Sequence, residues 1–224
     1  MKQSTNTLLC GIGLIFTFVL WTILVVTVDV RPEGVNQTNI GLSDLNTWFH
    51  SVTGVHMSLY TITDWAGLVP VFVCFVFGFA GLTQMIKRRS FKKVDSDIIF
   101  LGVYYVLVIA CYLIFESVTI NYRPVLIDGN MESSYPSSTT LLVLCVMPTL
   151  VIQSERRFIK TALKNIIKIF CMIFSVFMVV GRLVSGVHWL TDIVGSLFLS
   201  AGLFLIYKSV VLFADEQEAN RGIS

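Results

Sequence analysis

Three ionisable residues interrupt a strongly apolar part of the chain near its C-terminal end. Residues 181–192 read Gly-Arg-Leu-Val-Ser-Gly-Val-His-Trp-Leu-Thr-Asp, in which Arg182, His188 and Asp192 are ionisable. Such a side chain at membrane depth costs about 2.5–3.5 kcal/mol even on the mildest insertion scales. On a helix, His188 and Asp192 share a face, so the carboxylate can hold one imidazole nitrogen while the other stays free and basic. The spacing therefore predicts a catalytic or phosphate-binding histidine.

The composition predicts that these residues lie in a membrane protein. Hydrophobic residues make up 55% of the chain and charged residues 13%, with a mean hydropathy of +0.79, which is outside the range of ordinary soluble domains. A bilayer core of about 30 Å requires about 20 apolar helical residues. We therefore expect an all-α polytopic membrane protein, a bundle of six transmembrane helices in one domain over 1–224. The expected spans are 7–28, 66–86, 98–118, 139–153, 166–184 and 190–213.

The sequence also predicts the structure of the two ends of the chain. The stretch 7–28 is too long for the apolar part of a secretory signal and no small-residue cleavage pattern follows it, so we expect a retained span. The tail from Ala214 to Ser224 is short and polar, and we expect it to be frayed. The five cysteines all lie in apolar runs without metal-ligand spacing, so neither a disulfide nor a metal site is predicted.

Basic residues predict the orientation of the bundle. They fill the second predicted connection and surround the fourth, at Lys87, Arg88, Arg89, Lys92, Lys93, Arg156, Arg157, Lys160, Lys164 and Lys168. Short cytoplasmic loops collect lysine and arginine, so we expect both loops and both termini in the cytoplasm, and the plasma membrane as the location. Attraction to anionic lipid headgroups is a compatible second role for these loops. The cations left on the outer face are Arg31, Arg123 and Arg182.

Three segments distant in sequence are then expected at the outer face. They are Arg123-Pro124 after the third span, 135–139 before the fourth span, and 182–192 between the fifth and sixth spans. Planar arginine donors, hydroxyls and backbone amides stabilise the charge on a phosphoryl group during its transfer. Arg123, Ser137, Ser138 and Arg182 are therefore candidate phosphate ligands, with the amides at the start of the fourth span as an anion nest. Ser137 can alternatively serve as a helix cap.

These segments and their spacing resemble the type 2 phosphatidic acid phosphatase superfamily, which includes lipid phosphate phosphatases and, more remotely, vanadium haloperoxidases. The family motifs are Lys, six residues, Arg-Pro; Pro-Ser-Gly-His; and Ser-Arg, five residues, His, three residues, Asp. The resemblance covers the chain from the third to the sixth helix. The matching residues are Arg123, Pro124, Pro136, Ser137, Arg182, His188 and Asp192, whereas Glu116, Ser138, Thr139 and Gly181 replace the family's Lys, Gly, His and Ser.

The resemblance implies a membrane-embedded lipid phosphatase. In it His188 would attack a lipid-linked phosphate or diphosphate and form a phosphohistidine, while Asp192 holds the imidazole in its nucleophilic tautomer, in agreement with general nucleophilic catalysis. A site at the bilayer edge reaches a headgroup while the lipid tail stays in hydrocarbon. Polyprenyl diphosphate carriers, phosphatidic acid and phosphatidylglycerol phosphate are the candidate substrates that the family suggests. No metal, no organic cofactor and no nucleic acid is implied, and the oligomeric state is not predicted.

The departures from the motifs leave alternatives open. Thr139 cannot supply the proton that an imidazolium gives to a leaving oxygen. Either the substrate is a diphosphate, whose phosphate leaving group has a second pKa of about 6 and needs little protonation, or another acid substitutes. His56, with Asp64 nearby, and Glu116, if burial keeps it protonated, are auxiliary candidates. Asp64 can also cap the second span or pair with a site arginine, and Glu116 can pair with Arg123.

A rival function comes from another class of protein. A catalytically silent relative would bind a phosphorylated lipid as a sensor, scaffold or transport accessory, and the missing lysine and histidine favour it. A transporter is less favoured, because the interrupted repeats of transporters are not apparent in the sequence.

Overall fold

The chain folds into long helices with no sheet in the described part, as predicted. The computed structural model describes residues 2–222, within which paired backbone outside the helices is limited to isolated bridges. The α-helices are α1 (Lys2–Thr27), α2 (Ser43–Thr53), α3 (Met57–Ala66), α4 (Leu68–Arg88), α5 (Ser96–Ser117), α6 (Ser138–Arg157), α7 (Thr161–Val184) and α8 (Leu190–Gly222), with short 3-10 turns at Val35–Gln37 and Phe91–Lys93.

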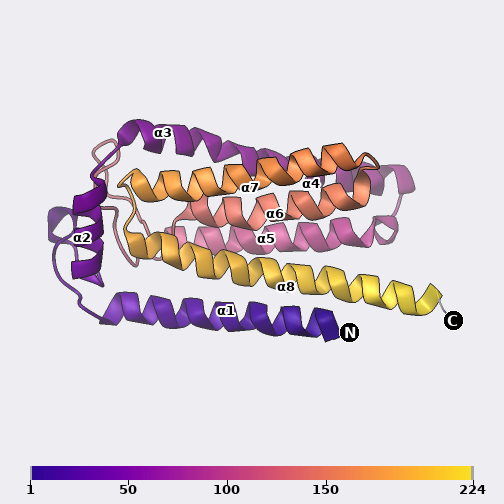
Figure 1. Cartoon of the computed structure of the whole chain (residues 1–224), viewed down its shortest axis with the longest axis horizontal. Helices are drawn as coiled ribbons and strands as arrows, with labels where there is room; N and C mark the ends of the chain where they lie inside the picture. Colours follow the sequence, from indigo (N-terminus) through magenta and orange to yellow (C-terminus); the bar gives the residue numbers. More distant parts are fainter. Residues whose placement is uncertain (1, 223–224) are drawn as a thin grey trace.

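Six helical segments of the described chain are long and apolar enough to cross a membrane, which confirms the prediction of six spans. They are α1, α3 and α4 taken together, α5, α6, α7 and α8. Figure 1 shows these helices running along the long axis, with the short α2 lying across one end. Large apolar side chains such as Phe72, Phe75 and Ile166 are exposed on the outside of the bundle, as expected for surfaces that face lipid.

Two boundaries differ most from the sequence predictions. The second span begins at Met57 rather than at residue 66, because α3 continues almost directly into α4. The expectation of a frayed tail from Ala214 was wrong as far as Gly222, because α8 runs to that residue. Hydrogen bonds from Ser4 to Glu216 and from Arg156 to Asp215 hold the end of α8 against the bundle. Residues 223 and 224 lie outside the described part.

Helix α6 is the central element that connects the rest of the bundle to the site. It contacts α4, α5, α7 and α8, and Val143, Cys145, Val146 and Met147 are fully buried along it. Because its neighbours surround it, its N-terminus is held at a fixed place between the connections that reach the α2 end of the bundle.

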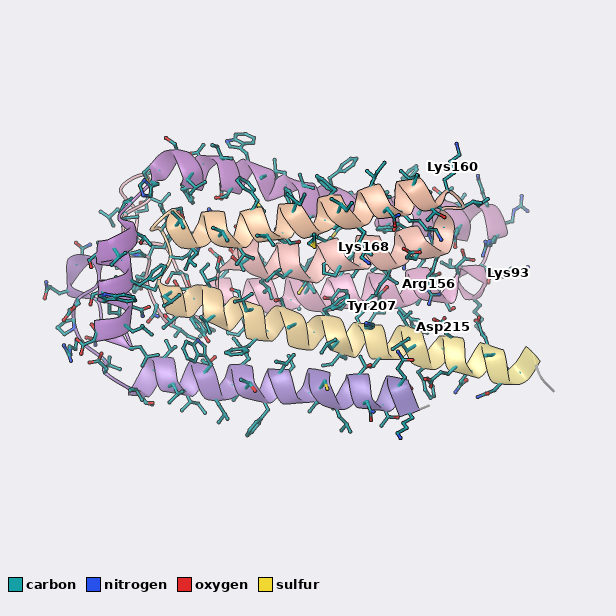
Figure 2. All side chains as sticks on the ribbon, viewed as in Figure 1. Lys93, Arg156, Lys160, Lys168, Tyr207 and Asp215 are labelled. Atoms are coloured by element: carbon teal, nitrogen blue, oxygen red, sulfur yellow. The ribbon has the colours of Figure 1, made fainter. Side chains whose placement is uncertain are left out.

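The two ends of the bundle carry different chemistry. Figure 2 shows Lys93, Arg156, Lys160 and Asp215 toward the end opposite α2, which we call the basic end. The three segments predicted to converge lie at the other end, which we call the α2 end, beside α2 and the connections around it (Figure 1). Arg123 and Arg182 therefore lie far from the basic loops, as the charge pattern predicts. That the α2 end faces outward stays a prediction.

Helices α1 and α8 approach each other closely through glycine. A Cβ atom on Gly202 would lie 2.7 Å from the side chain of Ile15 and 3.1 Å from its backbone nitrogen, and one on Gly11 would lie 3.0 Å from Ile206. Helices in lipid gain stability from such close packing, since the surrounding hydrocarbon supplies little other driving force.

We predict that Gly202→Val separates α1 from α8 and destabilises the protein by about 1–3 kcal/mol, the usual cost of overpacking. The readout is thermal unfolding of the purified protein in detergent, followed by size-exclusion chromatography of heated samples. Gly13→Val on α1 is the matched control, because a Cβ there meets nothing within 4 Å. Equal melting of both variants would contradict this account of the α1–α8 contact.

Candidate functional site

The centre of the site is a contact between an arginine and the histidine. Nη1 of Arg123 lies 3.2 Å from Nε2 of His188. An arginine can only donate hydrogen bonds, so Nε2 of His188 must accept with its lone pair, and the neutral ring carries its proton on Nδ1. This tautomer leaves Nε2 as the basic atom, as a nucleophilic or proton-accepting histidine requires.

Asp192 lies behind the imidazole at the start of α8. Its Oδ2 is 3.6 Å from Nδ1 of His188 and accepts a hydrogen bond of 2.9 Å from the backbone nitrogen of Trp189. The 3.6 Å separation exceeds a hydrogen bond, but contacts of this kind often tighten when a substrate binds. The backbone bond fixes the carboxylate on the Nδ1 side of the ring, where it can stabilise an imidazolium.

Arg182 lies on α7 and contacts two other helices. Its Nη2 donates to Oδ1 of Asp64 at 2.9 Å and to the hydroxyl of Thr139. The Arg182 side chain is buried, yet its Nε and Nη1 atoms have no hydrogen-bond partner in the described part of the chain. Buried donors without acceptors cost free energy, so a ligand with several acceptor oxygens would suit this guanidinium.

The two guanidinium groups converge on one aromatic ring. The Arg182 and Arg123 guanidinium carbons lie 4.9 Å and 5.8 Å from the ring centroid of Tyr60, which belongs to α3. Nε of Arg123 also pairs with Glu132 at 3.0 Å. The pairing of Arg123 with Glu116 that the sequence suggested is therefore wrong, because Glu132 in the α5–α6 connection provides that carboxylate instead.

The loop that carries His188 contacts three other segments of the chain. Nε2 of His50 lies 3.1 Å from the carbonyl oxygen of Gly186, and the indole nitrogen of Trp189 donates to the Tyr122 carbonyl at 2.8 Å. Gly186 has a φ of +70° and approaches Gly54 so closely that a Cβ there would lie 2.0 Å from its carbonyl oxygen. These contacts fix the path of the backbone on both sides of His188.

Helix α2 also holds the start of α8. Nδ2 of Asn46 donates to the Thr191 hydroxyl at 3.0 Å, and the Thr191 backbone nitrogen donates to Oδ1 of Asn46 at 3.2 Å. All of these atoms belong to buried residues. The paired bonds satisfy a backbone group that a helix start leaves open, so they stabilise the turn that contains Asp192.

Ser137 and Ser138 occupy different places at the start of α6. The hydroxyl of Ser137 is buried and donates to Thr140 at 3.0 Å, while its backbone nitrogen donates to the carbonyl oxygen of Asp192. Ser138 and Thr139 instead line the cavity described below. The first amides of a helix have no partner within it, so the cavity-lining residues of α6 can present backbone donors to an anion.

Burial and charge keep the histidine neutral. Removal from solvent lowers the pKa of His188 well below its ordinary value, and the positive charges of Arg123 and Arg182 lower it further. The imidazole is therefore uncharged at neutral pH, in agreement with the tautomer deduced from the Arg123 contact.

A cavity of about 1590 Å³ extends from the polar residues into an apolar groove between α4 and α5, and this groove is open on the outside of the bundle. Its polar end is lined by Tyr60, Asp64, Arg123, Glu132, Thr139 and Arg182. From there it extends toward the basic end along an apolar groove, which we define by Val71, Phe75, Gly78, Leu82, Gly102 and Val106. An anionic group at the arginines and an extended apolar chain would therefore fit one continuous space.

The structure brings together most of the candidate residues, but not all of them. Arg123, Arg182, His188 and Asp192 form one cluster, with Asp64 and Thr139 bonded to it. Glu116 lines the cavity, but within residues 2–222 no hydrogen bond or ion pair joins it to either arginine. The His56 ring bonds to the Thr53 carbonyl and does not line the cavity. Within the described residues, no cluster of three or more His, Cys, Asp or Glu side chains is placed to hold a metal ion.

Several site residues were missed by sequence reasoning. Tyr60, Glu132 and Asn46 support the cluster, and none was a candidate. For Tyr60 and Glu132, a position near the predicted outer face was the available signal, since an acidic or aromatic residue there can satisfy an arginine. Nothing in the sequence pairs Asn46 with Thr191, because the contact depends on how α2 folds back across the bundle.

Comparisons with known proteins agree with this architecture. The family model described as the PAP2 superfamily matches residues 115–215. No curated protein sequence matches the chain. Among solved structures, a transmembrane PAP2 type phosphatidylglycerolphosphate phosphatase from Bacillus subtilis is similar in fold, with a TM-score of 0.56 and 16% identity over 92% of this chain and 96% of that chain. The matched segment contains Arg123, Arg182, His188 and Asp192, so the family model supports the resemblance of this part of the chain to the PAP2 superfamily.

Proposed function

We propose that the protein is a lipid phosphatase, which removes a phosphoryl group from a lipid-linked phosphate or diphosphate through His188, at the outer face of the membrane. The observation that carries this proposal is the convergence of two buried guanidinium groups on a neutral histidine whose Nε2 carries the lone pair. The match of residues 115–215 to the PAP2 superfamily model supports phosphatase activity at the family level.

In this proposal, binding of the phosphate exposes the nucleophile. Phosphate oxygens accept hydrogen bonds from Arg123 and so replace Nε2 of His188 as its partner. The unpartnered Nε and Nη1 of Arg182 take further oxygens, and amides of Ser138 and Thr139 complete the anion site. Nε2 then attacks phosphorus, and Asp192 stabilises the imidazolium through Nδ1. Water hydrolyses the resulting phosphohistidine.

The apolar groove supports a lipid as the substrate. A headgroup at Arg123 and Arg182 would leave its chain along α4 and α5, where the cavity is lined by apolar side chains and glycines. A water-soluble phosphate ester would leave this part of the cavity unused. Lipid-linked phosphates and diphosphates are therefore the proposed class, with membrane lipid as the surrounding partner.

One observation favours the rival function, a silent lipid-binding protein. The Thr139 hydroxyl accepts a hydrogen bond from Arg182 and is not a proton donor to a substrate. Arg182 is already paired with Asp64, and Arg123 with Glu132. A protein that only binds a phosphorylated lipid needs the arginines but not the nucleophile. Phosphate release separates the two functions directly.

We expect the purified protein in detergent to release phosphate from lipid monophosphates or diphosphates, and His188→Ala to lower this rate by about 10⁴-fold or more, because the nucleophile is lost. Lipid labelled with ³²P should leave an acid-labile label on the wild-type protein. His56→Ala is the matched control and should retain activity, since the His56 ring bonds to the Thr53 carbonyl and not to Arg123 or Arg182. Lipid binding without release by the wild-type protein would favour the silent relative.

We expect Gly102→Leu to lower the turnover of long-chain lipid phosphates by about 10-fold or more, because the new side chain fills the apolar groove. A Cβ at Gly102 meets nothing within 4 Å, so the helix accommodates it. Turnover of a short-chain phosphate should fall much less. Gly13→Leu, on the open face of α1, controls for a leucine added elsewhere. Equal losses with both chain lengths would show that the groove does not hold the lipid.

Histidine protonation provides an independent test. We expect the ring of His188 to stay neutral in the folded protein at about pH 6, where an ordinary histidine is largely protonated, because its pKa is lowered. The measurement is NMR of protein with ¹³C-labelled histidine, with the signal assigned by His188→Gln. The unfolded chain at the same pH is the control. A His188 signal that moves with an ordinary midpoint would contradict the described electrostatics.

A further inference from the structure

A proton is required when an alkoxide leaves a phosphate monoester, and the site described so far does not supply it. His188 is occupied as the nucleophile, and Arg123 and Arg182 remain charged in the working pH range. The Thr139 hydroxyl accepts a hydrogen bond from Arg182 and is a poor acid at neutral pH. Another group that reaches the cavity must therefore provide the proton, if such monoesters are turned over.

Asp64 lies beside the Thr139 hydroxyl, which is too weak an acid to supply the proton. The same Nη2 atom of Arg182 donates to Oδ1 of Asp64 at 2.9 Å and to the Thr139 hydroxyl. Because both oxygens accept hydrogen bonds from this one nitrogen, the Asp64 carboxyl group lies next to Thr139 at the polar end of the cavity. The Asp64 side chain is 55% exposed, whereas that of its partner Arg182 is 2% exposed. The carboxyl group is thus accessible from the polar end of the cavity.

The other acidic and histidine side chains are less suitable. Glu132 forms an ion pair with Nε of Arg123, on the guanidinium that contacts the nucleophile. Within residues 2–222 Glu116 has no hydrogen bond or ion pair to either arginine, and the His56 ring bonds to the Thr53 carbonyl instead. Asp64 is therefore the one of these four that contacts Arg182.

We propose that Asp64, on α3 and outside the segment matched by the family model, is the general acid and base of the reaction. This inference rests on the proposed function. A phosphate bound to Arg182 would place its leaving oxygen near this carboxyl group. The proton comes from water through the exposed face of the side chain.

The protons balance over the two steps. In the first step Nε2 of His188 forms a bond to phosphorus, the bond from phosphorus to the alcohol oxygen breaks, and protonated Asp64 gives its proton to that oxygen. In the second step the Asp64 carboxylate takes a proton from water, whose oxygen bonds to phosphorus as the bond to Nε2 breaks. The products are the lipid alcohol and hydrogen phosphate, and Asp64 is again protonated.

The experiment compares two leaving groups in one set of variants. Asp64→Asn should lower kcat for a lipid monophosphate, whose leaving group is an alkoxide, by about 10²–10⁴-fold. The same variant should lower kcat for nitrophenyl phosphate much less, because nitrophenolate leaves without protonation. Asp64→Glu should recover part of the lipid activity. Size-exclusion profiles in detergent verify that each variant is folded.

Glu132→Gln is the matched control, because it removes a carboxylate from the other arginine of the same cavity. We expect it to change the rates for both substrates by a similar factor, since it alters phosphate binding without removing the proton donor. Equal losses for both substrates in Asp64→Asn would reduce Asp64 to a positioning residue for Arg182 and overturn the inference. A wild-type protein without phosphatase activity on either substrate would overturn the proposed function itself.

Discussion

The hydrogen bond between Arg123 and His188 is the interaction on which the organisation of the site depends. Burial lowers the pKa of His188, and the permanent cation of Arg123 beside the imidazole lowers it further, so the ring is neutral. The contact with Arg123 also places the lone pair of the ring on Nε2. Neighbouring side chains keep the two positive groups close together: both guanidinium groups lie near the Tyr60 ring, and Glu132 and Asp64 offset their charge.

The carboxylates give the site a second property. Each arginine has its own anion at the cavity wall, so the guanidinium groups are held in place before any ligand arrives. A phosphate would exchange one anionic partner for another rather than meet bare charge. Such preorganisation lowers the reorganisation needed when charge develops in a transition state. It also places the Asp64 carboxyl group beside Arg182, the position that the proposed acid and base role requires.

The bundle contributes a path from the bilayer to the site. Glycines on α4 and α5 leave room between these helices, and the resulting groove is continuous with the polar end of the cavity. Elsewhere glycine has the opposite effect, since Gly202 lets α8 approach α1 closely. The same residue type thus opens one helix interface and closes another, depending on what lies opposite. Glycine spacing in the sequence does not reveal which of the two applies.

The sequence by itself determined the six spans and the all-α class, because the length of an apolar stretch is a local feature of the chain. It also singled out Arg123, Arg182, His188 and Asp192, because ionisable side chains at membrane depth are energetically costly. Only the tertiary structure decided the partners. Glu132 rather than Glu116 pairs with Arg123, Asp64 and Thr139 share Arg182, and Asn46 holds the start of α8. These contacts join helices and loops far apart in the chain. They depend on helix rotation, on the fold of the α5–α6 connection and on the position of α2, none of which a local pattern specifies.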